Sequence, residues 1–173
     1  RTELLKLWRE HPEGILDLHA SGPPLGLVMK QAKQQGIKVQ WLAHFGAENS
    51  DLVRDYGPIV EQLFYPYPYD HTAQDAGIQS FVSAYQAKYQ EPPELGAANG
   101  YDALRVIAKA VAAVGEQPLA AKRFLLALPA FSGAGGIIKF DQNGDIERPI
   151  LIKEIQNGRF MQAPRVKGNC SLG

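Results

Sequence analysis

The chain has 173 residues and a mass of 19.0 kDa, and its 45% hydrophobic and 21% charged residues are typical of a soluble globular protein. Its 18 Lys and Arg residues balance its 18 Asp and Glu residues, and this neutral charge argues against a nucleic-acid or anionic-membrane partner. The longest strongly apolar run, residues 124–128, is too short to span a bilayer. The single Cys170 excludes an internal disulfide framework and leaves both an exported and a cytosolic location open.

Residues 1–64 alternate between helical and strand patterns, with short turns between them. Apolar residues at spacings of three and four predict helices, and short apolar runs between turn signals predict strands. The expected helices are 2–10, 22–35 and 51–56, and the expected strands are 15–20, 37–43 and 59–64. Because strands that alternate with helices pair in parallel through right-handed crossovers, this part of the chain predicts a parallel α/β sheet.

The segment Tyr65-Pro-Tyr-Pro-Tyr69 has a different character, since each proline fixes its own φ and pushes the preceding tyrosine toward extended geometry. We expect it to be a stiff connector. Beyond it, the pattern predicts helices at 72–89, 96–114 and 118–128 and strands at 137–140, 150–155 and 159–163. The Asn157-Gly158 pair between the last two apolar runs predicts a tight hairpin.

Two stretches resemble known binding loops, but each has a simpler interpretation. The glycine-rich residues 131–136 follow a helix and precede a strand, which is the opposite order to a phosphate-binding loop, so a flexible turn is favoured. Asp141, Asn143 and Asp145 resemble the first ligands of a calcium loop, but the required glycine and final acidic ligand are missing. We therefore expect a turn between strands there, and no metal or cofactor.

The stronger candidates for ligand contact follow the predicted parallel strands, at the edge where open α/β sheets bind ligands. His19 and His44 there either bind a metal, hydrogen-bond an anionic or phenolic ligand, or are structural. A metal is disfavoured because no third ligand is spaced nearby. Ser21 is either a helix cap or a ligand-binding hydroxyl, because no Gly-x-Ser-x-Gly elbow surrounds it. Tyr67 shares one face of its extended segment with the neighbouring tyrosines, which either line a cleft or shield the connector. No nucleophile, base and oxyanion donor come together, which argues against an enzyme.

A series of segments, in order along nearly the whole chain, resembles the type I periplasmic solute-binding proteins of ABC transporters, in the branched-chain amino-acid-binding family. The segments are 22–39, 81–93, 99–110, which begins Asn-Gly-Tyr-Asp-Ala-Leu, and 131–153. The resemblance implies two α/β lobes with parallel sheets, joined by hinge crossings, with a small-molecule ligand in the cleft. Because Arg1 begins inside a helical pattern without a signal segment, we expect the chain to be the C-terminal half of such a protein.

The resemblance also divides the chain into parts of the two lobes. The expected parts are a second-lobe α/β segment (1–64), a hinge connector (65–71), a first-lobe helical segment (72–136), a hinge return (137–148) and second-lobe terminal strands (149–173).

The function that the resemblance implies is the substrate-binding component of an ABC importer, in the periplasm or tethered to the membrane outside the cell. It would capture a small organic ligand by cleft closure and deliver it to the membrane permease. The alternative is a ligand-sensing domain of a receptor or regulator with the same fold. A third interpretation is an α/β enzyme that uses His19, His44 or Ser21.

Family ligand contacts come from the loops after second-lobe strands, and Tyr101 matches a first-lobe position that faces the cleft. The ligand-binding residues expected from the chain are Ser21, Gly22, His44, Phe45, Gly46, Tyr67, Tyr101 and His19. Phe45 stands where amino-acid-binding members carry an acidic residue for the ligand ammonium. An apolar or aromatic carboxylate is therefore favoured over an amino acid.

Overall fold

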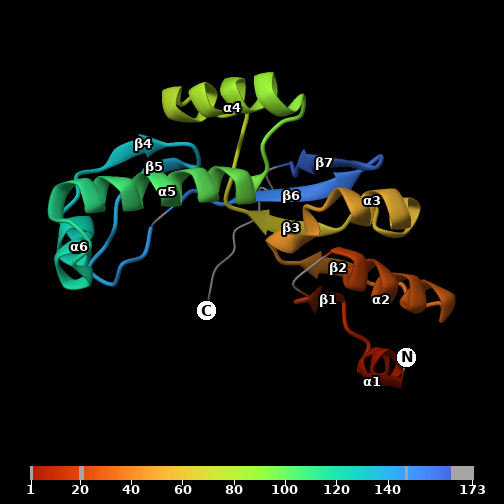
Figure 1. Cartoon of the computed structure of the whole chain (residues 1–173). Helices are drawn as coiled ribbons and strands as arrows, with labels where there is room; N and C mark the ends of the chain where they lie inside the picture. Colours follow the sequence, from red (N-terminus) through yellow and green to blue (C-terminus); the bar gives the residue numbers. More distant parts are fainter. Residues whose placement is uncertain (1, 20–21, 147, 165–173) are drawn as a thin grey trace. The chain divides into compact units, whose positions relative to one another are not determined.

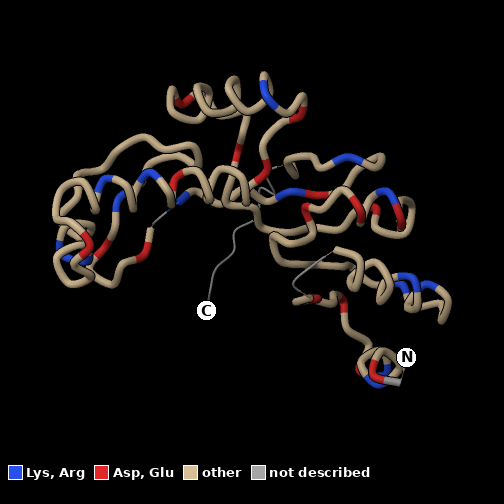
Figure 2. Tube along the Cα trace, viewed as in Figure 1, with Lys and Arg blue, Asp and Glu red and all other residues tan. Residues whose placement is uncertain are grey.

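The computed structural model describes residues 2–19, 22–146 and 148–164 (Figure 1). The chain divides into two compact units. Unit 1 consists of Arg1–Tyr67 and Leu151–Gly173, and unit 2 consists of Pro68–Ile150. Lys and Arg are interspersed with Asp and Glu along both units (Figure 2).

Unit 1 is built on one five-stranded sheet with the strand order β1-β2-β3-β6-β7. Its strands are β1 (Gly14–Asp17), β2 (Gln40–Ala43), β3 (Phe64–Tyr67), β6 (Leu151–Gln156) and β7 (Arg159–Gln162). The first three strands are parallel, as the alternating pattern predicts, whereas β6 and β7 are each antiparallel to the preceding neighbour. The Asn157-Gly158 hairpin between β6 and β7 is confirmed, with positive φ at both residues.

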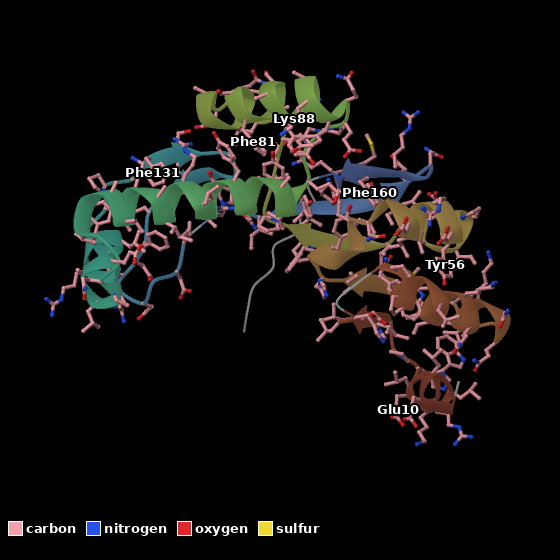
Figure 3. All side chains as sticks on the ribbon, viewed as in Figure 1. Glu10, Tyr56, Phe81, Lys88, Phe131 and Phe160 are labelled. Atoms are coloured by element: carbon pink, nitrogen blue, oxygen red, sulfur yellow. The ribbon has the colours of Figure 1, made fainter. Side chains whose placement is uncertain are left out.

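The first helix of unit 1 precedes β1 in the chain, and the others lie between the parallel strands. They are α1 (Thr2–Arg9), α2 (Gly22–Gln34) and α3 (Ser50–Tyr56), with short 3-10 helices η1 (Phe45–Ala47) and η2 (Gly57–Ile59). Helices α2 and α3 pack closely, because Gly26 lets the backbone of α2 approach Tyr56, which Figure 3 labels. A Cβ atom at Gly26 would lie only 2.3 Å from Cδ2 of the Tyr56 ring. Right-handed crossovers in one direction place both helices on the same face of the sheet.

The third strand lies later in the chain than the sequence pattern predicts. The expected strand at 59–64 is instead η2 and a turn in which Val60 and Leu63 are fully buried, and β3 begins only at Phe64. The first three residues of the expected connector, 65–67, are therefore part of the sheet. Pro66 is accommodated there because the pairing of β3 with β2 is limited to Phe64, so the missing N–H of the proline breaks no bond to β2.

The two faces of the unit 1 sheet differ in their exposure. On the face covered by α2 and α3, Trp41, Tyr65 and Ile155 are buried. The opposite face carries apolar side chains that are largely exposed, and the row Leu16–Leu42 runs directly across β1 and β2. The exposed apolar side chains of this face, called the open sheet face below, are Leu16, Leu42, Ile152 and Met161.

In its described residues, unit 2 contains three helices and a β-hairpin. These are α4 (Ala76–Tyr89), α5 (Leu95–Val114) and α6 (Pro118–Leu126), followed by β4 (Phe131–Gly133) and β5 (Gly136–Ile138). The glycine-rich stretch 131–136, expected to be a flexible turn, therefore forms much of an antiparallel hairpin. The Asp141–Asp145 turn is held by the Asp141 carboxylate, which accepts hydrogen bonds from the backbone N–H groups of Asn143 and Asp145.

Helix α5 has apolar residues on two faces. The face with Ala98, Val106 and Ala110 is buried, whereas Leu104 and Ile107 on another face of the helix are exposed. Within the part of the chain that the structure describes, α5 and the other helices all fall short of the length and apolarity that a membrane crossing requires.

Candidate ligand-binding site

The carboxyl ends of β1, β2 and β3 lie at one edge of the unit 1 sheet. The parallel register pairs Asp17 with Ala43, so the residues that follow these two positions leave neighbouring strands at the same edge. His19 follows β1, the loop His44–Gly46 follows β2, and Tyr67 is the last residue of β3. The structure therefore gathers these sequence-predicted residues at one sheet edge, as the strand order requires.

His19 is oriented by a carboxylate of its own strand. Its Nδ1 lies 2.7 Å from Oδ1 of Asp17, and its backbone N–H donates to the same oxygen at 2.9 Å. The Asp17 side chain is buried, whereas half of the His19 side chain is exposed. Because the carboxylate accepts a hydrogen bond from Nδ1–H, the ring is fixed with Nε2 directed away from Asp17.

His44 is oriented by its own loop in the opposite sense. Its Nδ1 accepts a hydrogen bond of 2.8 Å from the backbone N–H of Gly46, which caps the short helix η1. An accepting Nδ1 carries no proton, so the neutral ring carries its proton on Nε2 and is a donor there. The ring also contacts Phe45, with 5.0 Å between the centroids and a tilt of 57°. The Phe45 side chain remains 52% exposed.

Gly22 and Ser21 belong to the connection between β1 and α2. Gly22 is the first residue of α2 and is buried, and a Cβ atom there would lie 2.8 Å from the Cβ of Leu52 and 3.0 Å from that of Asn49. This position therefore allows close packing of α2 against the start of α3. Ser21 lies outside the described residues.

A buried charged cluster lies directly behind the His44 loop. Glu48, which follows η1, forms an ion pair through Oε1 with Lys153 of β6. Its Oε2 accepts a hydrogen bond of 2.8 Å from the hydroxyl of Tyr65 in β3. Burial and the negative charge of Glu48 raise the pKa of Tyr65 well above its ordinary value.

Tyr67 is part of this cluster and not an exposed wall of the site. Its side chain is buried, its ring meets that of Tyr65 edge to face at 6.4 Å between centroids, and the Lys153 ammonium lies 4.8 Å from its ring centroid. Of the two interpretations of the tyrosines that the sequence left open, shielding by packing describes the environment of Tyr65 and Tyr67.

Tyr101 belongs to unit 2, on α5. Its ring packs against Phe81 of α4, which Figure 3 labels, with 4.9 Å between centroids, and the Arg105 guanidinium lies 5.5 Å from its ring. Both aromatic rings line a groove of about 380 Å³ between α4 and α5. Tyr101 is thus partly covered within its own unit.

Three bonded polar side chains at this edge were missed by reasoning from the sequence, namely Asp17, Glu48 and Lys153. Lys153 interrupts an apolar run that predicts a buried strand, and a buried lysine requires a carboxylate partner. Asp17 stands two residues before His19, a spacing that allows a local bond at the end of a strand. Nothing near Glu48 in the sequence indicates its partner, which lies 105 residues away.

Comparison with known proteins identifies the class of this α/β fold. The family model described as periplasmic binding protein matches residues 7–159, and the chain belongs to this family. It is a type I member of the branched-chain amino acid group, a class of solute-binding proteins of ABC transporters and not of enzymes. Membership implies a location outside the cytoplasm.

Individual relatives agree with this assignment. The leucine-, isoleucine-, valine-, threonine-, and alanine-binding protein of Pseudomonas aeruginosa is 29% identical over 125 residues, which are 72% of this chain and 33% of that protein. A leucine-binding protein of Thermotoga maritima is 28% identical with a TM-score of 0.84, over 94% of this chain and 47% of that one. An ABC transporter substrate-binding protein of Desulfitobacterium hafniense in complex with Leu is 26% identical with a TM-score of 0.71, over 93% and 47%. The chain thus spans a third to about half of the length of these relatives.

Proposed function

We propose that this chain forms part of the substrate-binding component of an ABC importer and that its ligand is an apolar or aromatic monocarboxylate. The observation that carries the choice of ligand is the loop after β2. Its most exposed ligand-facing candidate is the phenyl ring of Phe45, held against the His44 ring. A phenyl ring offers apolar area and a π face, and it cannot neutralise an ammonium as a carboxylate does.

The carboxylates at this edge support the same choice, because each is already bonded within the protein. Both oxygens of Glu48 are engaged, by Lys153 and by Tyr65. Oδ1 of Asp17 receives two bonds from His19, and the Asp17 side chain is buried. An amino-acid ligand would therefore bring an ammonium to an edge whose described carboxylates have other partners.

A donor for the carboxylate of the ligand is available on the same loop. Because Nδ1 of His44 accepts from Gly46, its Nε2 is the protonated nitrogen and donates outward. His44 offers a hydrogen-bond donor, and Phe45 offers an aromatic surface beside it. An arylalkanoate complements both, because its carboxylate accepts the hydrogen bond and its aryl ring packs against the phenyl ring.

The second candidate ligand is an aliphatic amino acid. It is favoured by the names of the relatives at 26–29% identity, which are a leucine-binding protein, a protein in complex with Leu and a binding protein for five amino acids. The two candidates differ chemically in one group, the α-ammonium.

Matched ligand pairs that differ only in this ammonium provide the test. We expect 3-phenylpropanoate to raise the melting temperature of the full-length protein and to bind more tightly than phenylalanine by calorimetry, and 4-methylpentanoate to bind more tightly than leucine. A preference of at least about 100-fold, ~2.7 kcal/mol, is expected, because a buried ammonium without a carboxylate is costly. Tighter binding of leucine than of 4-methylpentanoate would instead establish the amino acid as ligand.

The variant Phe45→Glu tests the role of this residue. A carboxylate at position 45 supplies the partner that an ammonium needs, so we expect the preference within each pair to shift toward the amino acid. Phe160 on β7, labelled in Figure 3, is a matched control, since β7 is separated from β2 by β3 and β6 in the sheet and the Phe160 ring meets that of Tyr65 at 6.5 Å between centroids. Phe160→Leu is expected to leave the order of ligand preference unchanged.

The chain passes between its two units at Tyr67 and again at Ile150. We propose that these passages serve as hinge crossings, so that closure of the protein around the ligand forms the state that the membrane permease recognises. Tethering to the membrane surface outside the cell would keep the protein near that permease.

A further inference from the structure

We propose that Glu48 is a positioning residue that bonds the loop His44–Ala47, called the ligand loop below, to two strands. These are β3, from which the chain enters unit 2, and β6, on which it returns. Glu48 would thereby set both the order of the loop His44–Ala47 and the affinity for the ligand. Because this loop is part of the proposed ligand site, the consequence for affinity rests on the proposed function.

The position of Glu48 makes it the link between the loop and the sheet. Its backbone N–H closes η1 by donating to the carbonyl of Phe45 at 3.1 Å, so its main chain is part of the loop. Its side chain leaves the loop and reaches two strands, with Lys153 of β6 on Oε1 and the Tyr65 hydroxyl of β3 on Oε2. One carboxylate thus bonds the loop to two separate strands.

The burial of the pair indicates that its geometry is specific. The side chains of Lys153 and Glu48 are 10% and 11% exposed, and the Tyr65 ring beside them is buried. Removing two charges from water is costly, and an apolar pair of similar volume is often as stable. A buried ion pair therefore contributes little to stability that apolar packing would not, whereas it fixes the positions of its partners, because either charge alone would be left unpaired.

The cluster also lies where the chain changes units. Strand β3 ends at Tyr67, directly before unit 2 begins, and β6 starts at Leu151, directly after unit 2 ends. The Lys153 ammonium contacts the carboxylate of Glu48 and, at 4.8 Å, the ring of Tyr67. A displacement of either strand relative to the loop would break one of these contacts. The same contacts therefore tie the ligand loop to both crossings.

The test compares Glu48→Gln, Lys153→Met and the double variant in the full-length protein. Each single variant leaves one charge or acceptor in the buried site without its partner and is expected to lower the melting temperature. In the double variant, Gln at position 48 still accepts from Tyr65 and no charge is buried, so the melting temperature is expected to return near that of the parent. The link to β6 stays broken.

Loop order is measured by amide hydrogen exchange without ligand. In the double variant we expect exchange at positions 46–48 to rise by about tenfold, while α2 and α3 keep their protection. Unchanged exchange at 46–48 would overturn the proposal. A rise that is equal across unit 1 would overturn it as well, because it would show general destabilisation and no positioning. Asp51→Asn removes an exposed ion pair with Arg54 on α3 and is the control. It is expected to change neither the melting temperature nor the exchange at 46–48.

Affinity is measured with 3-phenylpropanoate and leucine as probes. For whichever probe the parent protein binds, we expect the dissociation constant of the double variant to rise about tenfold although its melting temperature is retained. An unchanged dissociation constant would overturn the coupling of Glu48 to the ligand. If the parent binds neither probe, the proposed function fails, and the exchange experiment still decides whether Glu48 positions the loop.

Discussion

The carboxylate of Asp102 on α5 is bound by the chain itself. It accepts hydrogen bonds from the backbone N–H groups of Ala134 and Gly135, at 2.7 and 2.8 Å, in the turn between β4 and β5. Successive N–H groups in a glycine-rich turn form a natural anion site, and here the anion is an internal side chain. The sequence resemblance to a phosphate loop thus has a structural explanation in which the glycine-rich turn holds α5 against the hairpin.

Two buried phenols give the chain a predictable response to alkaline pH. Burial, with the charge of Asp102, raises the pKa of Tyr69 from 10.0 to about 12, and the pKa of Tyr65 is raised further above its ordinary value. Because the folded-state pKa exceeds that of the unfolded chain, the stabilisation is complete below about pH 10 and is lost as the pH rises through 12.

We therefore expect the tyrosinate absorbance of Tyr69 and Tyr65 to appear late in an alkaline titration, together with the loss of near-UV circular dichroism. The difference between the parent and Tyr69→Phe, and between the parent and Tyr65→Phe, isolates each phenol. The expectation would be wrong if either variant, while still folded, showed less tyrosinate absorbance near pH 10 than the parent. The substituted tyrosine would then ionise near its ordinary pKa.

At the scale of elements, Asp75 joins a helix to a strand. Its Oδ1 accepts from the N–H groups of Gly77 and Ile78 at the start of α4 and from the Ser132 hydroxyl of β4 at 2.6 Å. The Ser132 bond, with the backbone bonds, holds the pKa of Asp75 below its usual range. The stabilisation is therefore present above the ordinary carboxyl pKa and is lost as the pH falls through the folded-state value.

Asp75→Ala is expected to lower the free energy of unfolding by about 1 kcal/mol at neutral pH, measured by urea denaturation, because the helix loses its N-cap. Asp75→Asn keeps an acceptor and is expected to cost less. The exposed Ser83→Ala, in the middle of the same helix, is the control. A cost for Asp75→Ala that persists unchanged at acid pH would show that the charged carboxylate is not responsible.

The elements that were predicted correctly are those specified by local patterns. Apolar spacing and flanking glycine or proline are enough for α2, α5 and the Asn157-Gly158 hairpin. Strands β3 and β4 depend on distant partners, β6 for Tyr65 and α4 for Ser132, and local residues carry no sign of that pairing. The candidate site divides in the same way. Strand order predicts the edge that holds His19 and His44, but a bond between residues 105 apart, such as Glu48 to Lys153, requires the fold.

At the scale of the whole molecule, each unit has apolar surface without a covering layer among the described residues. In unit 1 it is the open sheet face, and in unit 2 it is the face of α5 that carries Leu104 and Ile107. The helices α2 and α3 lie on the other face of the unit 1 sheet, and this chain spans only 47% of the Thermotoga maritima leucine-binding protein. Contiguous exposed apolar surface promotes association, so the 173-residue chain studied alone is expected to self-associate.

Alanine variants of the open sheet face separate its effect on association from its effect on stability. Leu16 and Leu42 are 57% and 40% exposed, so we expect Leu16→Ala/Leu42→Ala to change the free energy of unfolding by roughly 0.5 kcal/mol or less per site. The same variant is expected to weaken concentration-dependent association in sedimentation velocity. Ile155 is fully buried on the opposite face, and Ile155→Ala is expected to cost about 2–5 kcal/mol. If the Leu16 and Leu42 variant in dilute solution lost as much free energy of unfolding as Ile155→Ala, this face would be covered within the chain. The expected self-association would then be contradicted, because no exposed apolar surface would promote it.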